Sequence, residues 1–448
     1  MRAETETQAS LIRRIIKIWW PLAASWLLMA IELPAISAIM ARLANPEINL
    51  AAYGGIVLPL ALLIESPILM LLAASTTLSK DWSSYQKIRK YMLGAGLALT
   101  LLHIAIAFTP LYYVVVQGIL GAPAEIVEPG RLGLMIMLPW SWSIAYRRFN
   151  QGVLIRFGHS RVIGIGTAVR LSTEIVVLTV GFLNGTLPGI AVGAAAVAAG
   201  VLSEACFIGW RVQPVLREKL RHAPAVEHAL TARSFMAFYI PLVMTSLLSL
   251  LIEPLGSAAL SRMPNALESL AVWPVIHGLL FMLQSPGIAL NEVVVTFLDR
   301  PGAARPLRAF AIMLIVVTTT LLTAIAATPL ALLWFSRVAA LPPNLVEIAR
   351  ASLWLVLPLP AMAALQSWFQ GTLLHSRHTR GITESVVIYL VTVGGLLVAG
   401  VAMEQFTGLF VALFAFCAGT VLQTGWLWLR SLPSVRQNLR SLSPNPRE

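Results

Sequence analysis

The sequence predicts an all-α integral membrane protein with twelve transmembrane helices in two parallel six-helix repeats and both termini in the cytoplasm. Three observations predict it. The chain of 448 residues is 58% hydrophobic and only 12% charged, whereas soluble domains carry about 25% charged residues. Apolar runs of about 18 residues or more, each long enough to cross ~30 Å of hydrocarbon as a helix, recur from end to end. Prolines, glycines and arginines also recur at a nearly constant separation of about 220 positions.

Twelve apolar segments are long enough to be transmembrane helices. They are too long and too poor in alternation for the strands of an outer-membrane barrel, which are ~10-residue alternating segments. The expected helices cover residues 14–39, 52–79, 88–116, 128–156, 161–183, 187–212, 232–260, 270–298, 306–336, 345–374, 380–402 and 406–430. The first of them is expected to be an uncleaved span, because its apolar run is long and lacks a clear small-residue cleavage site.

The positions of lysine and arginine predict which side of the membrane each loop faces. Cytoplasmic loops carry the excess of these residues. Alternate loops hold 24 of the 32 basic residues on the side of the termini and 5 on the other, and three arginines lie inside spans. Both termini are therefore expected in the cytoplasm, with the chain in the cell inner (plasma) membrane. The basic residues behind the net charge of +12 are concentrated in the loops on one side of the membrane, which argues against a nucleic-acid partner.

The two halves of the chain align with each other at an offset of 219 or 220. The aligned pairs include Pro34 with Pro254, Ser37 with Ser257, Arg42 with Arg262, Asn45 with Asn265, Pro139 with Pro358, Gly200 with Gly419 and Arg211 with Arg430. Chance similarity between helices rich in leucine and alanine does not match proline, glycine and arginine at a fixed distance. Each half has six expected spans, so both enter from the same side as parallel repeats. We expect an N-lobe over residues 1–222, a C-lobe over residues 223–448, and a central cavity between them.

This layout resembles the multidrug/oligosaccharidyl-lipid/polysaccharide flippase (MOP) superfamily, which includes the multidrug and toxic compound extrusion (MATE) transporters. The stretches IWWPLAASW (18–26), LAAYGG (50–55) and LPWSWSIAYRRFNQGVLIRFGHSR (138–161) resemble the progressive ankylosis (ANK) branch. The resemblance implies a secondary active transporter that exports small organic solutes by alternating access. The ANK branch implies organic anions such as pyrophosphate, nucleotide or citrate. The alternatives are a proton- or sodium-coupled efflux antiporter for cationic drugs and a flippase for a lipid-linked precursor.

Carboxylates inside apolar spans are the candidates for ion coupling. An ionisable group at the bilayer centre costs roughly 2.5–3.5 kcal/mol on insertion scales and usually faces a cavity or a partner. Glu32 and Glu253 each stand just before a proline, which tends to bend a helix and leaves a carbonyl unbonded. We expect that carbonyl and the carboxylate to bind H⁺ or Na⁺, with Glu65 as a third candidate. The resemblance places a coupling carboxylate at Glu32. The alternative for both residues is a structural carboxylate paired with an arginine near the outer interface.

Arginines inside the spans are the candidates for substrate binding. Arg147 and Arg148 are adjacent in the expected helix 128–156, and arginine forks match the oxygens of phosphates and carboxylates. The functional interpretation is an anion clamp. The alternative is an ion pair with Glu174 or Glu204, or side chains that extend toward the cytoplasm. The further candidates for substrate binding are Arg170, Glu204, His277 and Glu292.

The duplication retains prolines and glycines but not charges. Arg147 aligns with Gln366, Arg148 with Ser367, Glu65 with Gln284 and Glu204 with Gln423. Shared positions are therefore expected to bend and pack helices, whereas unshared ionisable positions are better candidates for a site. His103 and His277 are expected to be hydrogen-bonded core residues more often than proton carriers.

The sequence contains no pattern typical of an enzyme. It has no G-x-x-x-x-G-K-[ST] phosphate loop, and Cys206 and Cys417 lie far apart in apolar runs without metal-ligand spacing. We therefore expect a monomeric transporter that is not an enzyme and needs no cofactor beyond a coupling H⁺ or Na⁺. Its expected partners are a small-molecule substrate and the lipid bilayer.

Overall fold

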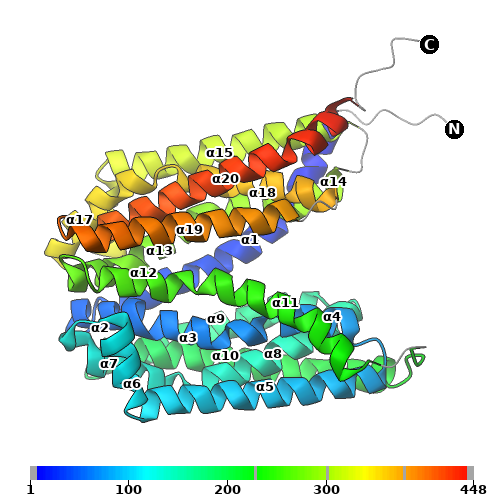
Figure 1. Ribbon diagram of the computed structural model, residues 1–448, viewed down its shortest axis with the longest axis horizontal. Coiled ribbons are helices and arrows are strands. Elements are labelled where there is room, and N and C mark those ends of the chain that lie inside the picture. Colours follow the sequence, from blue (N-terminus) through cyan, green and yellow to red (C-terminus); the bar gives the residue numbers. More distant parts are fainter. Residues whose placement is uncertain (1–7, 227–229, 299–301, 377–379, 441–448) are drawn as a thin grey trace. The chain divides into compact units, whose positions relative to one another are not determined.

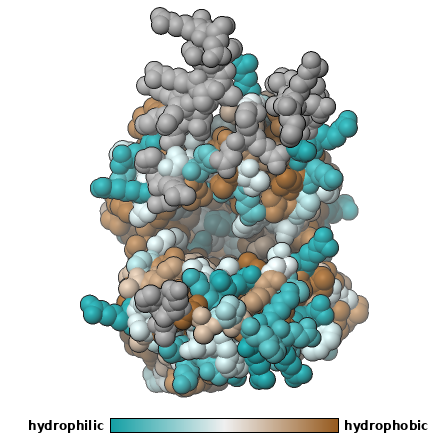
Figure 2. All heavy atoms as spheres, turned by 90° about the vertical axis from the view of Figure 1, so that its right-hand side faces the viewer, coloured by the Kyte–Doolittle hydropathy of each residue, from teal (hydrophilic) through white to brown (hydrophobic). Residues whose placement is uncertain are grey.

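The computed structural model describes residues 8–226, 230–298, 302–376 and 380–440, and all regular structure in these ranges is helical (Figure 1). Eleven helices among the described residues are long and apolar enough to cross a membrane. The prediction of an all-helical chain with many membrane-spanning segments is therefore confirmed. On the face seen in Figure 2, hydrophilic side chains gather over helix ends, and hydrophobic ones lie along the flanks.

The helices form two compact units, each described by itself. Unit 1 comprises Met1–Ala35 and Val275–Glu448, and unit 2 comprises Ile36–Pro274. Two helices, α1 (Gln8–Met40) and α13 (Ala266–Ile288), are divided between the units.

The remaining elements each belong to one unit. Those of unit 2 are α2 (Pro46–Ala52), η1 (Tyr53–Val57), α3 (Leu58–Leu69), α4 (Leu71–Leu78), α5 (Trp82–Phe108), α6 (Leu111–Tyr113), η2 (Val114–Leu120), α7 (Ala124–Ile136), α8 (Leu138–Arg156), α9 (Arg161–Asn184), α10 (Gly189–Pro214), η3 (Val215–Leu220), α11 (Ala232–Leu250) and α12 (Ile252–Leu260). Those of unit 1 are α14 (Leu290–Phe297), α15 (Ala304–Ala327), α16 (Leu330–Leu333), η4 (Trp334–Val338), α17 (Pro343–Ser352), η5 (Leu353–Val356), α18 (Leu359–His375), α19 (Arg380–Met403) and α20 (Gly408–Arg440).

The units group the first helix of each half differently from the expected lobes 1–222 and 223–448. In unit 1, the indole Nε1 of Trp19 on α1 donates to the carbonyl of Pro286 on α13 at 2.9 Å. In unit 2, the hydroxyl of Tyr239 on α11 donates to the carbonyl of Pro67 on α3 at 2.5 Å. Trp19 and Tyr239 are aligned positions, as are Pro67 and Pro286. The same contact is thus made twice. Unit 1, which holds most of the second half of the chain, includes the start of α1, and unit 2, which holds most of the first half, includes α11.

Left-handed backbone conformations recur at aligned positions. The three pairs are Asn45 (φ 51°) with Asn265 (φ 55°), Gly121 (φ 68°) with Ala340 (φ 55°), and Gly185 (φ 67°) with Glu404 (φ 52°). A residue with a Cβ atom is disfavoured in this region, so the recurrence follows the backbone path and not residue preference. It supports the alignment of the two halves independently of side-chain identity.

The proline beside Glu253 interrupts its helix, whereas the one beside Glu32 does not. α11 ends at Leu250 and α12 begins at Ile252. Pro254 has no N–H to donate to the carbonyl of Leu250, which accounts for the break. By contrast, α1 continues through Pro34 to Met40. The expected bend is therefore present as a helix break only in the second half.

The expected span 128–156 is not among the eleven apolar helices. It is formed by the end of α7 and by α8, which meet at Met137. Four arginines inside it, Arg131, Arg147, Arg148 and Arg156, lower its hydropathy. Because α8 contacts α3, α4, α5 and α10, Arg147 and Arg148 lie among protein helices. A count of twelve spans stays a prediction.

α1 begins and α20 ends on the same side of unit 1 (Figure 1). Ile15 packs in a core cluster with Phe297 and Leu307, and Trp428 lines a pocket together with Leu298. The terminal segments 1–7 and 441–448 lie outside the described residues, and their cytoplasmic location stays a prediction.

Candidate functional site

Six charged side chains gather in the interior of unit 2. They are Glu65 on α3, Arg147 and Arg148 on α8, Arg170 and Glu174 on α9, and Glu204 on α10. We call this set the charge network. Five members have between 1% and 7% of their surface exposed, and Arg148 is half-buried. An uncompensated buried charge is strongly destabilising, and the network balances three arginines with three glutamates.

Glu204 lies at the centre of the network. Its Oε2 accepts a hydrogen bond from Arg147 Nη1 in a buried ion pair. Its Oε1 accepts from the side-chain amide of Gln151 at 3.0 Å. Arg170 Nε lies 3.7 Å from Glu204 Oε2 and 3.8 Å from Glu174 Oε1. One carboxylate therefore joins α8, α9 and α10.

Two glycines make room for the carboxylates between α9 and α10. A Cβ atom on Gly166 would lie 3.3 Å from Cγ of Glu204, and one on Gly200 would lie 2.5 Å from Oε1 of Glu174. Real Cβ atoms do not approach as closely as the second distance, so any larger residue at Gly200 must displace the Glu174 carboxylate. The network thus depends on small residues in the facing helix as well as on opposite charges.

Glu65 and Arg148 form the second part of the network. The Glu65 carboxylate interacts electrostatically with both Arg148 and Arg147. The indole N–H of Trp140 approaches Glu65 without completing a hydrogen bond, and Glu65 Oε2 has no hydrogen-bond partner among the described residues. The Nε groups of Arg147 and Arg148 likewise have none within that part of the chain. The two Nε donors and the Oε2 acceptor could therefore bind an ion or a ligand.

Several predicted residues meet in the network. The structure brings together Glu65, Arg147, Arg148, Arg170 and Glu204. Arg147 makes the ion pair with Glu204 that was the alternative to an anion clamp. Gln151 escaped prediction because it is uncharged. Gln151 stands four residues after Arg147 and so lies on the same helix face, and this spacing is the sequence signal that could have identified it.

The other candidates lie elsewhere. Glu253 is half-buried on α12, and no ion pair among the described residues joins it to the network. In unit 1, Glu32 is half-buried on α1, and Glu292 is exposed on α14. His277 is half-buried, with its ring 6.0 Å from that of Phe416.

His103 is a hydrogen-bonded core residue, as expected. It is fully buried on α5. Its Nδ1 lies 3.2 Å from the hydroxyl of Ser141, and its Nε2 lies 2.9 Å from the carbonyl of Leu134. Both ring nitrogens are therefore occupied within the bundle.

The corresponding interface of unit 1 is neutral. Gln366 Nε2 on α18 donates to Gln423 Oε1 on α20 at 3.2 Å and to the hydroxyl of Thr424 at 3.1 Å. Gln366 aligns with Arg147, and Gln423 aligns with Glu204. The same pair of helices is therefore bridged in both halves, by charged groups in one and by amides in the other.

Comparisons with known proteins identify the fold. No protein-family model and no curated protein matches the chain. Among solved structures, an inward-facing multidrug resistance MATE family transporter of the MOP superfamily matches with a TM-score of 0.69, 15% identity, and 92% of this chain and 96% of that chain covered. An outward-facing structure of such a transporter matches with a TM-score of 0.54, 14% identity, and coverage of 99% and 100%.

A third solved structure differs in the charge of its binding pocket. It is a MOP superfamily transporter from Pyrococcus furiosus Vc1, described as having a reverse polarity of the binding pocket that suggests a different function. It matches with a TM-score of 0.58, 15% identity and 97% of both chains covered. The resemblance to the ANK branch stays a prediction. This chain has the fold of the MATE transporters of the MOP superfamily.

Proposed function

We propose that this chain is a secondary active transporter that exports small organic solutes by alternating access. The observation that carries the proposal is the charge network, inside a fold that solved transporters adopt in inward-facing and outward-facing forms. A bundle in lipid has no structural need for six ionised side chains, and such residues usually mark a pathway for substrate or ions. We further propose twelve spans in two repeats, with both termini in the cytoplasm, in a monomer of the inner membrane.

We propose organic anions of the pyrophosphate, nucleotide or citrate type as the substrates. Arg147, Arg148 and Arg170 supply three guanidinium groups within one bundle, and two of them have Nε donors without a partner among the described residues. An anion can take the place of a glutamate carboxylate beside these groups if the displaced carboxylate binds a proton, so that no charge is left uncompensated. The binding pocket of reverse polarity in a MOP transporter of the same fold is an instance in which pocket charge differs within this fold.

A coupled cation exporter is the second candidate, favoured by Glu65. Its Oε2 is buried without a hydrogen-bond partner among the described residues, which leaves an oxygen for H⁺ or Na⁺. Under either substrate class we propose Glu65 as the coupling residue, with Glu32 and Glu253 as the further carboxylates to test. A lipid-linked precursor flippase is a further alternative.

Uptake into proteoliposomes tests the proposal. The full chain is reconstituted, and gradients of pH and Na⁺ are imposed in turn while uptake of labelled citrate, pyrophosphate or tetraphenylphosphonium is measured. We expect gradient-dependent anion uptake that falls at least tenfold in Arg148→Gln and loses its gradient dependence in Glu65→Gln. Glu347→Gln, which neutralises an exposed carboxylate on α17 outside the network, is the matched control and should keep full uptake.

Two results would change the assignment. Uptake of the cation alone, lost in Glu65→Gln and kept in Arg148→Gln, would establish the second candidate. Folded wild-type protein that moves neither solute class under any gradient would contradict the transporter proposal.

A further inference from the structure

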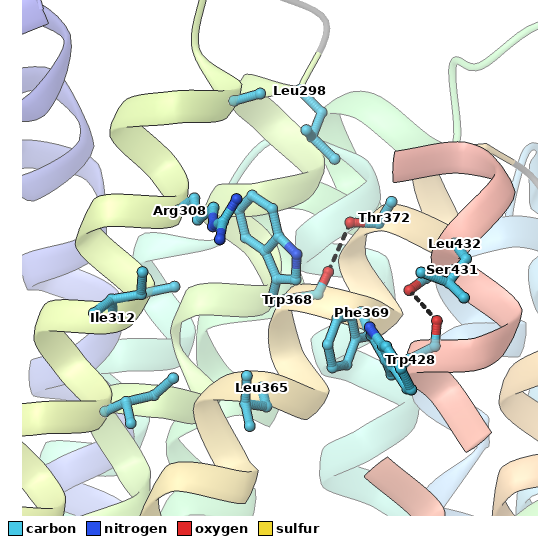
Figure 3. A pocket seen from close by; sticks show the side chains of 13 residues that line it. Leu298, Arg308, Ile312, Leu365, Trp368, Phe369, Thr372, Trp428, Ser431 and Leu432 are labelled. Atoms are coloured by element: carbon cyan, nitrogen blue, oxygen red, sulfur yellow. Dashed lines mark hydrogen bonds between the residues drawn. The ribbon is translucent and has the colours of Figure 1, made fainter. Parts of the chain in front are cut away.

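Unit 1 contains a cavity of about 370 Å³ between α15, α18 and α20, near the end of α14 (Figure 3). Ten of its thirteen lining residues are apolar, including Trp368, Phe369 and Trp428. None of the lining residues belongs to the charge network. The parts of all three helices that line the cavity are within candidate membrane spans.

Arg308 is the single charged residue among those that line the cavity. The hydroxyls of Thr372 and Ser431 donate to the carbonyls of Trp368 and Trp428 in their own helices, at 2.8 and 2.9 Å. They are therefore not available as donors to a polar ligand. Arg308 extends from α15 toward the pocket (Figure 3). It is exposed, and no hydrogen bond or ion pair to another described residue is recorded for it.

The first half of the chain fills the equivalent space with a tyrosine. Ala304 on α15 aligns with Tyr85 on α5, and Trp368 on α18 aligns with Phe149 on α8. In unit 2, the ring of the buried Tyr85 lies against the ring of Phe149, with 5.2 Å between centroids. The small side chain of Ala304 leaves the corresponding place beside Trp368 open.

A second tyrosine of unit 2, Tyr146, packs over a glycine at the aligned positions on the other side. Leu365 aligns with Tyr146, and Trp428 aligns with Gly209. A Cβ atom on Gly209 would lie 2.5 Å from the Tyr146 hydroxyl, so that tyrosine occupies the space over the glycine. The replacement of Tyr85 by Ala304 therefore opens space beside Trp368 in unit 1, whereas Trp428 takes up part of the space that Tyr146 occupies over Gly209 in unit 2.

From these contacts we propose that the cavity binds an acyl chain of an anionic phospholipid, with the lipid phosphate held by Arg308. An apolar interior with one cation at its edge fits an amphiphile with a hydrocarbon chain and an anionic head. A guanidinium matches phosphate oxygens in a bidentate geometry. Arg305, three positions earlier on α15 and also exposed, adds positive charge on the same helix face, and basic groups at the ends of spans attract anionic lipids.

Lipid retention by the purified full chain tests the proposal. The protein is exchanged into detergent with equal amounts of phosphatidylglycerol and phosphatidylcholine of identical acyl chains, and bound lipid is counted by native mass spectrometry. We expect wild type to retain phosphatidylglycerol about tenfold more often than phosphatidylcholine. Arg308→Gln should remove that preference, and Ala304→Tyr should remove retention of both lipids.

The matched control is Arg89→Gln. Arg89 aligns with Arg308 and is equally exposed, but it lies in the half whose tyrosines fill the space, so retention should not change. Equal retention of both lipids by wild type, or an unchanged preference in Arg308→Gln, would overturn the proposal. Because Arg308 is exposed, this variant decides the question even if Ala304→Tyr fails to fold.

Discussion

The α8–α10 interface of unit 2 and the α18–α20 interface of unit 1 occupy aligned positions and hold their helices together in different ways. The first uses the buried ion pair Arg147–Glu204, and the second uses the amide pair Gln366–Gln423. The neutral pair shows that this helix packing does not require charge. The charges of unit 2 are therefore an addition to a scaffold that forms without them.

Stability does not explain that addition. Replacing a buried ion pair with well-packed neutral groups is often neutral or stabilising by 1–4 kcal/mol, whereas removing one partner costs about 3–5 kcal/mol. A chain selected for stability alone has the amide pair available as a solution in its other half. We infer that the charge network is retained for what it binds.

The largest expected effect comes from breaking the ion pair on one side. Arg147→Gln or Glu204→Gln alone leaves a buried charge without its closest ion-pair partner, and we expect each to lower the free energy of unfolding by about 3–5 kcal/mol. The double variant reproduces the amide pair of unit 1 and should recover most of that loss. Thermal unfolding in detergent measures all three. Additive losses in the double variant would show that the two side chains do not act as a pair.

A smaller effect is expected from substitutions at Gly200 and Gly419, two aligned glycines that each pack closely against a facing helix. A Cβ atom on Gly200 would lie 2.5 Å from Glu174, and one on Gly419 would lie 2.5 Å from Val393, at aligned positions. Overpacking of this kind costs about 1–3 kcal/mol, so both alanine variants should unfold at lower temperature.

Solute uptake separates the two glycine variants. Gly200→Ala displaces a carboxylate of the network and should also reduce uptake, whereas Gly419→Ala displaces an apolar side chain and should keep it. Equal losses of uptake in both variants would remove the functional distinction between the two interfaces.

The smallest effect concerns the left-handed positions. Ala340 and Glu404 have φ of 55° and 52°, where the first half places glycines. Relief of the Cβ clash predicts that Ala340→Gly and Glu404→Gly each stabilise the protein by about 1 kcal/mol. The reverse changes, Gly121→Ala and Gly185→Ala, should destabilise it by a similar amount. Unfolding midpoints that do not move in opposite directions would contradict the structural equivalence of the halves.

The sequence predicts most of the helices and the members of the charge network for simple physical reasons. A helix in lipid needs about 20 apolar residues, so the spans stand out as runs. A charge inside such a run needs a partner, so Arg147 and Glu204 could be named together. Gly166 and Gly200 could not be assigned their role, because a close approach between helices is visible only once the helices are packed.

The grouping of the first helices was beyond prediction from one sequence. Alignment shows that Trp19 is equivalent to Tyr239 and Pro286 to Pro67, but it does not say which helix faces which. The hydrogen bonds of Trp19 and Tyr239 supply that information. The exposure of Glu292 could not be predicted either. An apolar run in the sequence does not show which face of its helix is buried and which is exposed, and Glu292 lies on an exposed face.

The most direct test of the claim that the charge network is retained for what it binds is to measure transport by the double variant Arg147→Gln/Glu204→Gln. Uptake of labelled anion into proteoliposomes is compared with wild type at equal amounts of folded protein, confirmed by the unfolding midpoint. We predict a midpoint near that of wild type and uptake reduced at least tenfold. Uptake at the wild-type rate in the folded double variant would show that the charges are structural and would contradict the claim.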